Sequence, residues 1–271
     1  MSDNTSKKFR LCIANTLFSV EPLSSVPEKY CKEFLCESVS HNSESEIQIK
    51  ISEADFENTK RRLTKQNSVF SSTDSSELSD SISESNIELL SLHKMLSEKL
   101  LSFDTILFHG SSINVINQGF NSSSGIIFTA PSGTGKSTHA EKWVRLFCDS
   151  QLKTEYINDD KPFIKVSDSP KIFGSPWMGK HHRGKNTSAP LKAICIITRS
   201  ETNYISPVSQ GEAFSEILKQ TYIPRDSSLL SKTISLVNIL SKKIRVFRIF
   251  CNTSDDAAHV ALKSLMEHGI L

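Results

Sequence analysis

The sequence predicts an α/β protein in which a small β-rich N-terminal portion precedes a larger domain of strands and helices. Two observations support this prediction. After residue 86, short apolar runs typical of buried strands alternate with segments whose apolar residues recur at helical spacing. One such run, at 126–129, leads into the glycine-rich turn APSGTGKST at 130–138 and then into a helical pattern. A strand, a glycine-rich turn and a helix in this order are typical of α/β domains that bind ligands at strand ends.

Composition limits the classes of protein that the chain could be. Its 271 residues have a formal net charge of +2, and 37% of them are hydrophobic. This near-neutral balance gives no reason to expect a nucleic-acid partner. No apolar run reaches the ~18 residues that a membrane span needs. The first ten residues lack the apolar stretch of a secretory signal, and the six cysteines form no C-x-x-C pair, so we expect reduced thiols in a cytoplasmic protein.

The N-terminal portion, expected over residues 1–63, shows strand signals. Residues 8–20 have a β-rich composition with a turn-like Asn15, and residues 46–52 alternate isoleucine with polar residues. The serine-rich, acidic stretch that follows has too little apolar surface to offset its ordering entropy. We therefore expect a flexible linker over residues 64–85.

The larger domain is expected over residues 86–271. Ser85 and Glu88 stand three apart before a row of leucines, a spacing that predicts a capping box and an amphipathic helix. Helical patterns near 210–221 and 226–243, and a last one opened by Ser254 and ending before Gly269, predict three further helices. Strand-like runs occur at 105–109, 113–117, 126–130, 154–159, 162–166, 191–198 and 244–250.

The turn at 130–138 has the residues of a phosphate-binding loop. Glycines 133 and 135 permit backbone angles that turn N–H groups toward an anion, and the following helix N-terminus adds partial positive charge. The ammonium of Lys136 can reach the β- and γ-phosphates of a nucleotide, and the hydroxyl of Ser137 can bind Mg²⁺. A glycine turn that merely joins a strand to a helix does not account for the complete Gly-Lys-Ser-Thr. The residues expected to bind the nucleotide are Ser132, Gly133, Thr134, Gly135, Lys136, Ser137 and Thr138.

Ala130 departs from the usual phosphate-loop pattern, which has glycine at that position. Alanine adds only a methyl group, but it restricts φ. We therefore predict that the loop opens with a negative φ at residue 130.

Polar residues close two of the apolar runs. Asp159 and Asp160 follow a strand-like run downstream of the loop, where a second strand of a nucleotide-binding sheet would end. Phosphoryl transfer needs a metal ligand and a base, and two neighbouring carboxylates can divide these roles. His109 ends another run and is expected to line a polar cleft. The alternatives are a plain Asp-Asp-Lys-Pro turn and a packing histidine.

The stretch 174–186, GSPWMGKHHRGKN, is rich in cations. One interpretation is a cover that brings cations to phosphate or to an acidic acceptor, with Lys180, Arg183 and Asn186 as candidate substrate-binding residues. The other is a solvated basic loop. The spacing of the residues leaves both open.

Together these motifs resemble the HPr kinase and phosphoenolpyruvate carboxykinase-like superfamily. In particular, the chain is similar to short bacterial HPr kinase-like serine kinases of peptide natural-product clusters. The resemblance covers residues 86–271 well. It is based on HGS at 109–111, APSGTGKSTH at 130–139, NDDKP at 158–162, GSPWMGK at 174–180, APLKAI at 189–194 and CN at 251–252.

This resemblance implies a phosphoenolpyruvate carboxykinase-like P-loop kinase core. It also implies transfer of the γ-phosphate of ATP, with Mg²⁺, to a hydroxyl group, usually a serine of a peptide or protein. Asp159 would be the general base, Asp160 and Ser137 would bind the metal, Lys136 would bind phosphate, and His109 would line the phosphate site. A homo-oligomer is implied as well.

Two alternatives to a peptide kinase are open at this stage. One is a kinase of a small hydroxyl compound such as free serine. The other is a nucleotide-binding sensor without turnover. The sequence does not name the phosphate acceptor, because no spacing rule decodes it.

Overall fold

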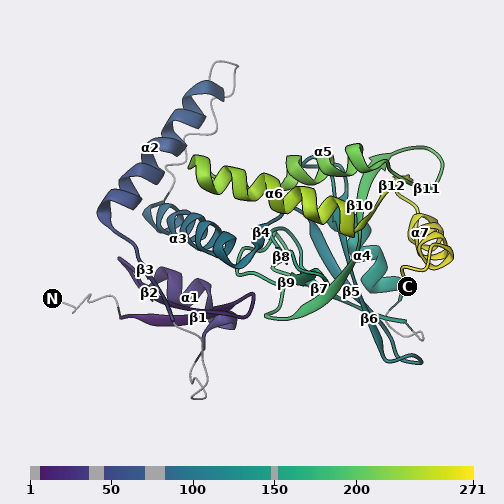
Figure 1. The fold of residues 1–271 in the computed structure, drawn as a ribbon, viewed down its shortest axis with the longest axis horizontal. Coiled ribbons are helices and arrows are strands. Elements are labelled where there is room, and N and C mark those ends of the chain that lie inside the picture. The colour runs from purple at the N-terminus through teal and green to yellow at the C-terminus, as the bar shows by residue number, and fades with distance from the viewer. Residues whose placement is uncertain (1–6, 37–45, 71–82, 148–151) are drawn as a thin grey trace. The chain divides into compact units, whose positions relative to one another are not determined.

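The computed structural model describes residues 7–36, 46–70, 83–147 and 152–271, with the backbone alone for 65–70. The fold is mixed α/β, with two compact units, Met1–Lys99 and Leu100–Leu271 (Figure 1).

The N-terminal unit contains a three-stranded sheet of β1 (Phe9–Ile13), β2 (Thr16–Glu21) and β3 (Ile47–Lys50). β1 and β2 form an antiparallel hairpin, and β3 pairs with β2 in parallel. Ala14 and Asn15 at the hairpin turn both have positive φ, 52° and 60°, as tight two-residue hairpin turns require. The expected strands and the turn at Asn15 are thus confirmed. The unit also contains α1 (Val26–Tyr30) and the 3₁₀ turn η1 (Lys32–Phe34).

The helix α2 (Glu53–Phe70) corrects the prediction of β structure up to residue 63 and of a flexible linker from residue 64. Its start is a capping box that the sequence analysis missed. The Ser52 amide donates to the Asp55 carboxylate (3.0 Å), and the Asp55 amide donates to the Ser52 hydroxyl (3.2 Å). The rest of the expected linker, residues 71–82, lies outside the described residues.

The helix α3 (Glu84–Leu100) begins near the expected place, but the predicted Ser85–Glu88 capping box is wrong. The Asn86 amide donates instead to the hydroxyl of Ser83 (3.3 Å). Glu88 is only 3% exposed, and its carboxylate accepts hydrogen bonds from the amides of Leu23 (2.7 Å) and Ser24 (3.1 Å). These bonds hold α3 within the N-terminal unit, so the division falls after Lys99 and not at residue 86.

The larger unit is built on one nine-stranded sheet. Its main order is β4-β8-β9-β10-β6-β5-β7, with β12 pairing with β10 and β11 pairing with β12. Each of the seven predicted strand runs overlaps a strand of this sheet. The short strands β9 and β11 were not predicted, because three or four residues give too little periodicity. The strands are β4 (Thr105–Leu107), β5 (Ser111–Asn117), β6 (Ser122–Thr129), β7 (Leu152–Asn158), β8 (Phe163–Lys165), β9 (Lys171–Phe173), β10 (Ser188–Arg199), β11 (Tyr204–Pro207) and β12 (Arg245–Cys251).

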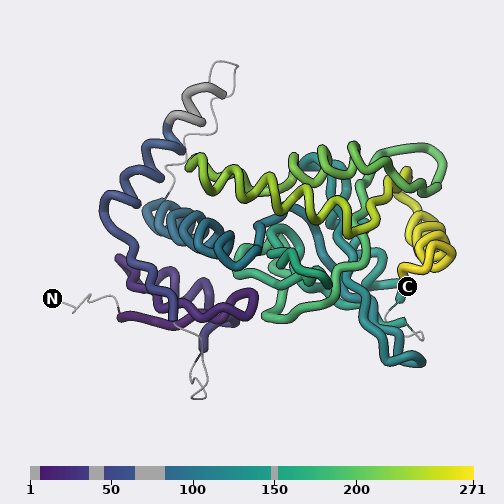
Figure 2. Tube along the Cα trace, in the orientation of Figure 1, coloured from purple at the N-terminus to yellow at the C-terminus, as the bar shows by residue number. Residues whose placement is uncertain are grey.

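The strand directions bring several chain segments to one edge of the sheet. β6 and β12 both run parallel to β10. β5 is antiparallel to both β6 and β7, so β7 runs in the same direction as β6. The carboxyl ends of β6, β7, β10 and β12 therefore meet at the same edge. The trace in Figure 2 shows the teal segment of β5 and β6 beside the green segment of β10, which lies far along the chain.

Two layers of helices cover the sheet (Figure 1). Alternating side chains of β6 face opposite layers: Ile127 belongs to a core with Ala213, while Phe128 belongs to a core with Trp143. The helices α4 (Lys136–Leu146), which carries Trp143, and α7 (Asp256–Glu267) form the first layer. The helices α5 (Gln210–Gln220), which carries Ala213, and α6 (Ser227–Lys243) form the second layer. The 3₁₀ turn η2 (Leu101–Phe103) precedes β4.

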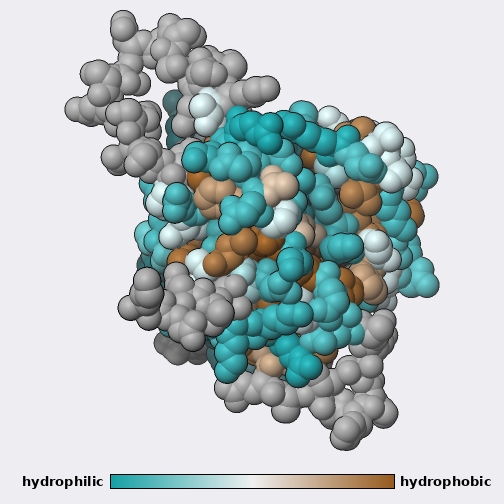
Figure 3. Space-filling view, turned by 90° about the vertical axis from the view of Figure 1, so that its left-hand side faces the viewer, coloured by the Kyte–Doolittle hydropathy of each residue, from teal (hydrophilic) through white to brown (hydrophobic). Residues whose placement is uncertain are grey.

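The surface in Figure 3 carries mainly polar and charged side chains, in keeping with the 23% of charged residues in the sequence. Among the described residues, no helix combines the length and the apolarity that a bilayer crossing requires. Cys31, Cys195 and Cys251 are buried, and burial raises the pKa of Cys31 to about 12.

Candidate functional site

The turn between β6 and α4 has the backbone of an anion-binding loop. Gly133 has a φ of 75° and Gly135 a φ of 122°, and Gly135 caps the N-terminus of α4. Side chains other than glycine rarely adopt these angles. The Thr134 amide closes a turn on the Pro131 carbonyl (3.3 Å). The two glycines therefore shape the entry to a helix N-terminus, where partial positive charge favours an anion.

Ala130 fits this loop without strain. It is not among the described non-glycine residues with positive φ, so the predicted negative φ is confirmed. Its methyl group is buried (1% exposed) in the core that also contains Phe128 and Trp143. Alanine at this position therefore extends the core by one methyl group at the end of β6.

Lys136 is the first residue of α4 and is only 8% exposed. Its ammonium donates to the carbonyls of Ala130 (3.0 Å) and Pro131 (3.5 Å) in the same loop. Burial lowers the pKa of Lys136, and the opposite charge of Asp160 works against that shift. The ammonium is thus partly removed from water, and its hydrogen-bond partners within the described ranges are carbonyl dipoles. Ser132, Ser137 and Thr138 are exposed around it.

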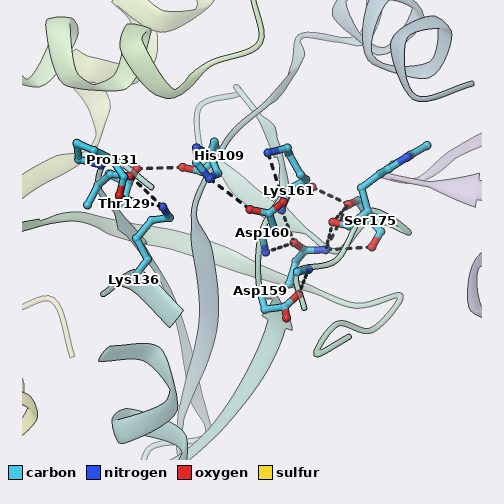
Figure 4. Close-up of polar contacts among 12 residues, drawn as sticks. His109, Thr129, Pro131, Lys136, Asp159, Asp160, Lys161 and Ser175 are labelled. Carbon is cyan, nitrogen blue, oxygen red and sulfur yellow. Dashed lines mark hydrogen bonds and ion pairs between the residues drawn. The ribbon is translucent and has the colours of Figure 1, made fainter. Parts of the chain in front are cut away.

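Asp160 accepts a hydrogen bond from His109, with 3.3 Å between its Oδ1 and the imidazole Nε2 (Figure 4). Its other oxygen lies 3.3 Å from the Lys161 ammonium. Burial raises the pKa of Asp160, but the hydrogen bond from His109 and the charge of Lys161 outweigh burial and leave the pKa below its usual value. His109 is attached to β6, because its carbonyl accepts from the Thr129 hydroxyl (2.9 Å). The predicted histidine and aspartate are therefore brought together beside the loop.

Asn158, the last residue of β7, shapes the acidic turn and was missed as a site residue. It is fully buried, and its side-chain carbonyl accepts from the amides of Asp160 (2.9 Å) and Lys161 (2.6 Å). Its amide group donates to the carbonyl of Ser175 (3.0 Å). An Asn before Asp-Asp-Lys-Pro is a signal for such a side-chain turn.

Asp159 faces away from its neighbour, toward the segment 174–186 (Figure 4). It is 4% exposed, and its carboxylate accepts hydrogen bonds from the amides of Gly179 (2.7 Å) and Arg183 (3.3 Å). The two aspartates, adjacent in sequence, thus have different surroundings.

The segment 174–186 is held to the sheet and to α4 by Arg183. The guanidinium donates to Glu141 (3.0 Å) and to the hydroxyl of Tyr156 (3.1 Å), and it lies 5.4 Å from the centre of the Tyr156 ring. Arg183 therefore acts as a structural contact of this segment. Lys180 and Asn186, the other candidate substrate-binding residues, are exposed.

Two cavities flank the phosphate loop, and neither was predicted. The first, of about 640 Å³, lies between the loop, α4 and the ends of β10 and β12. Its lining includes Thr138, His139, Arg199 and Asn252. The second, of about 520 Å³, lies on the α5 side of the same loop. Cavities of this size are typical of small-molecule sites.

The oxygen atoms at this edge suit Mg²⁺ held together with a nucleotide. Mg²⁺ in such sites uses one or two carboxylates, waters and substrate phosphates. The exposed hydroxyl of Ser137 and the carboxylate of Asp160 are ligands of this kind. Within the described ranges, no group of three His, Cys, Asp or Glu residues could hold a metal ion by itself. The residues therefore fit a metal that arrives with phosphate oxygens.

Replacing Gly174 with alanine is expected to lower the free energy of unfolding by at least about 2 kcal/mol. A Cβ at Gly174 would lie 1.9 Å from the backbone oxygen of Lys185, which cannot rotate away. Gly211→Ala in α5 is the matched control, since its Cβ would meet nothing within 4 Å. Chemical denaturation of both variants measures the difference, and equal stability of the two would contradict the expected clash.

His139 is expected to make stability depend on pH. It is buried beside the larger cavity, where its Nε2 accepts from the Trp143 indole (3.2 Å), and burial lowers its pKa to about 3. In the unfolded chain this imidazole takes up a proton near pH 6.5, so folding stability is complete above that pH and falls as the pH drops toward 3. The loss at pH 5 amounts to at most about 2 kcal/mol.

The variant His139→Gln isolates this effect, because glutamine keeps an acceptor for Trp143 but takes up no proton. Its free energy of unfolding should fall less between pH 7 and pH 5 than that of the wild type. His181→Gln, at an exposed position, should behave like the wild type. An identical pH dependence in all three proteins would rule out a role for His139.

The fold and the site thus define an α/β protein in which a glycine-rich turn at a helix N-terminus lies beside an aspartate–histidine pair. No protein-family model matches the chain, and no curated protein matches it. Among solved structures, it is similar to the HPr(Ser) kinase/phosphatase from Coxiella burnetii, with a TM-score of 0.33 and 10% sequence identity. The match covers 60% of this chain and 98% of that one. A similarity at this level does not indicate a function.

Proposed function

We propose that this protein is an ATP- and Mg²⁺-dependent phosphotransferase of the HPr kinase-like type, which transfers the γ-phosphate to a hydroxyl group. The observation that supports this most is the position of the Asp160–His109 pair beside the phosphate loop, close enough for the charge of Asp160 to act on Lys136. A kinase needs a phosphate-binding cation and a carboxylate within reach of the same phosphoryl group.

The phosphate loop would hold the nucleotide. The backbone amides around Gly133 and Gly135 and the N-terminus of α4 would bind the phosphates, and the 640 Å³ cavity beside them would take the nucleoside. The Lys136 ammonium would exchange its two carbonyl partners for phosphate oxygens, which carry full charge. Mg²⁺, held by Ser137 and Asp160, would offset the negative charge of the phosphates.

We assign the proton-accepting role to Asp160 with His109. The resemblance implied Asp159 for this role, but Asp159 is a buried residue whose carboxylate accepts two backbone amides. Asp160 has a side chain 32% exposed and an imidazole partner. When the acceptor oxygen bonds to the γ-phosphorus and the bond from that phosphorus to the β–γ bridging oxygen breaks, the hydroxyl proton passes to the Asp160–His109 pair, and ADP leaves.

The acceptor that we propose is a serine of a peptide or protein, as the resemblance implies. The test is transfer of labelled γ-phosphate from ATP to serine peptides, with free serine and other small alcohols as separate arms. Labelled peptide is the expected product. Transfer to small alcohols alone would show that the acceptor is a small hydroxyl compound and not a peptide. Nucleotide binding without transfer to any acceptor would indicate a sensor, and failure to bind nucleotide would overturn the proposal.

A further inference from the structure

We propose that Arg199 is a second phosphate-binding cation of this site, which binds the α- and β-phosphates of the nucleotide. The inference rests on the proposed function only in that it requires a nucleotide at the phosphate loop. It begins from the position of Arg199 as the last residue of β10, which runs parallel to β6 and ends at the same edge of the sheet.

The guanidinium of Arg199 contacts the phosphate loop directly. It donates to the carbonyls of Gly133 (2.5 Å) and Thr134 (3.5 Å), while the side chain is exposed. Lys136 makes the same kind of contact from within the loop, with the carbonyls of Ala130 and Pro131. Two cations therefore lie against four carbonyls of one loop. Carbonyl dipoles are weaker partners for a cation than phosphate oxygens are.

The charge environment of Arg199 differs from that of Arg183 and Arg248. Arg183 pairs with Glu141, and Arg248 pairs with Glu212. Arg199 has no ion pair with any carboxylate of the described residues, and its guanidinium donates to the two loop carbonyls. Its positive charge is thus available to an anion at the loop. A planar guanidinium also suits two-point binding of phosphate.

The order of the strands indicates which phosphates Arg199 would reach. β10 and β5 lie on opposite sides of β6. His109 precedes β5 and pairs with Asp160, so the transferred γ-phosphate belongs on that side. Arg199 belongs to the β10 side and lines the 640 Å³ cavity. Its partners are therefore the two phosphates that ADP and ATP share.

The test is calorimetric titration of the full chain with Mg-ADP and with the non-hydrolysable analogue Mg-AMP-PNP. Arg199→Gln is expected to weaken both ligands by the same factor, about tenfold or more, because one charge-assisted contact is lost. Arg199→Lys should recover part of the affinity. Because the lost contact is ionic, the affinity of Arg199→Gln should also fall less steeply with salt. Arg245→Gln is the matched control, since Arg245 also donates to a carbonyl but lies at the opposite end of β12.

The outcomes separate the inference from the proposed function. If the wild type does not bind Mg-ADP, the proposed function fails. If the wild type binds and Arg199→Gln binds equally well, the inference alone is overturned. If affinity falls with no change in its salt dependence, and lysine recovers nothing, Arg199 only holds the loop in shape and the inference is again overturned. Loss for the triphosphate analogue alone would contradict the assignment to the α- and β-phosphates.

Discussion

Replacing Lys136 with methionine is expected to lower the kcat of phosphoryl transfer by about 10²–10³-fold while leaving the unliganded protein folded. Lys136 is 8% exposed, and its ammonium donates to loop carbonyls and pairs with no carboxylate of the described residues. Methionine therefore removes a partly desolvated charge without breaking an ion pair. In the transferring state, however, no other side chain of the loop supplies a positive charge to the phosphates. Initial rates with labelled ATP measure the effect.

The control for this prediction is Lys192→Met, which removes an exposed lysine from the middle of β10. Its rate and its unfolding midpoint should match those of the wild type. A Lys136→Met protein that is folded and fully active would show that the loop does not act on the transferred phosphate. If Lys136→Met did not fold, the expectation that Lys136 contributes to ligand binding and not to stability would be wrong.

Replacing Asp160 with asparagine is expected to reduce kcat by at least about 10²-fold, since the proton acceptor and a metal-binding charge are both lost. The change is nearly isosteric and keeps a polar partner for His109. Because the folded-state pKa of Asp160 is below its usual value, the carboxylate stabilises the fold above about pH 3.9, and this contribution is lost as the pH falls below that value. The variant should therefore also lose part of its acid sensitivity.

Comparing Asp159→Asn with Asp160→Asn decides which of the two carboxylates accepts the proton. The Asp159 side chain accepts the amides of Gly179 and Arg183, so an asparagine there would place an NH₂ group against a backbone N–H and disturb the segment 174–186. We expect a lower thermal midpoint and a smaller loss of kcat than in Asp160→Asn. The reverse order of kcat losses would return the role of base to Asp159.

Much of the site could be predicted from short stretches of sequence. The loop glycines, the negative φ of Ala130 and the helix beginning at Lys136 all follow from conformational preferences of residues close together in the chain. The strands ending near His109 and Asp159 follow from apolar runs, and strand ends are where α/β proteins bind ligands. Capping was less certain, because Ser-x-x-acid spacing occurs both at 52–55, where it caps α2, and at 85–88, where it does not.

By itself, the sequence therefore determined the strand–loop–helix unit, the alternation of strands and helices in the larger unit, and the residue types at its candidate site. Only the tertiary structure decided what those residues contact. Glu88 bonds to residues 64 and 65 positions earlier, Asp159 to Gly179, and Arg199 to Gly133. Local preferences depend on neighbours within a few residues. The partner of a buried carboxylate or a loop-bound guanidinium depends instead on which strands lie side by side, and strand pairing between distant segments is not encoded in any short stretch.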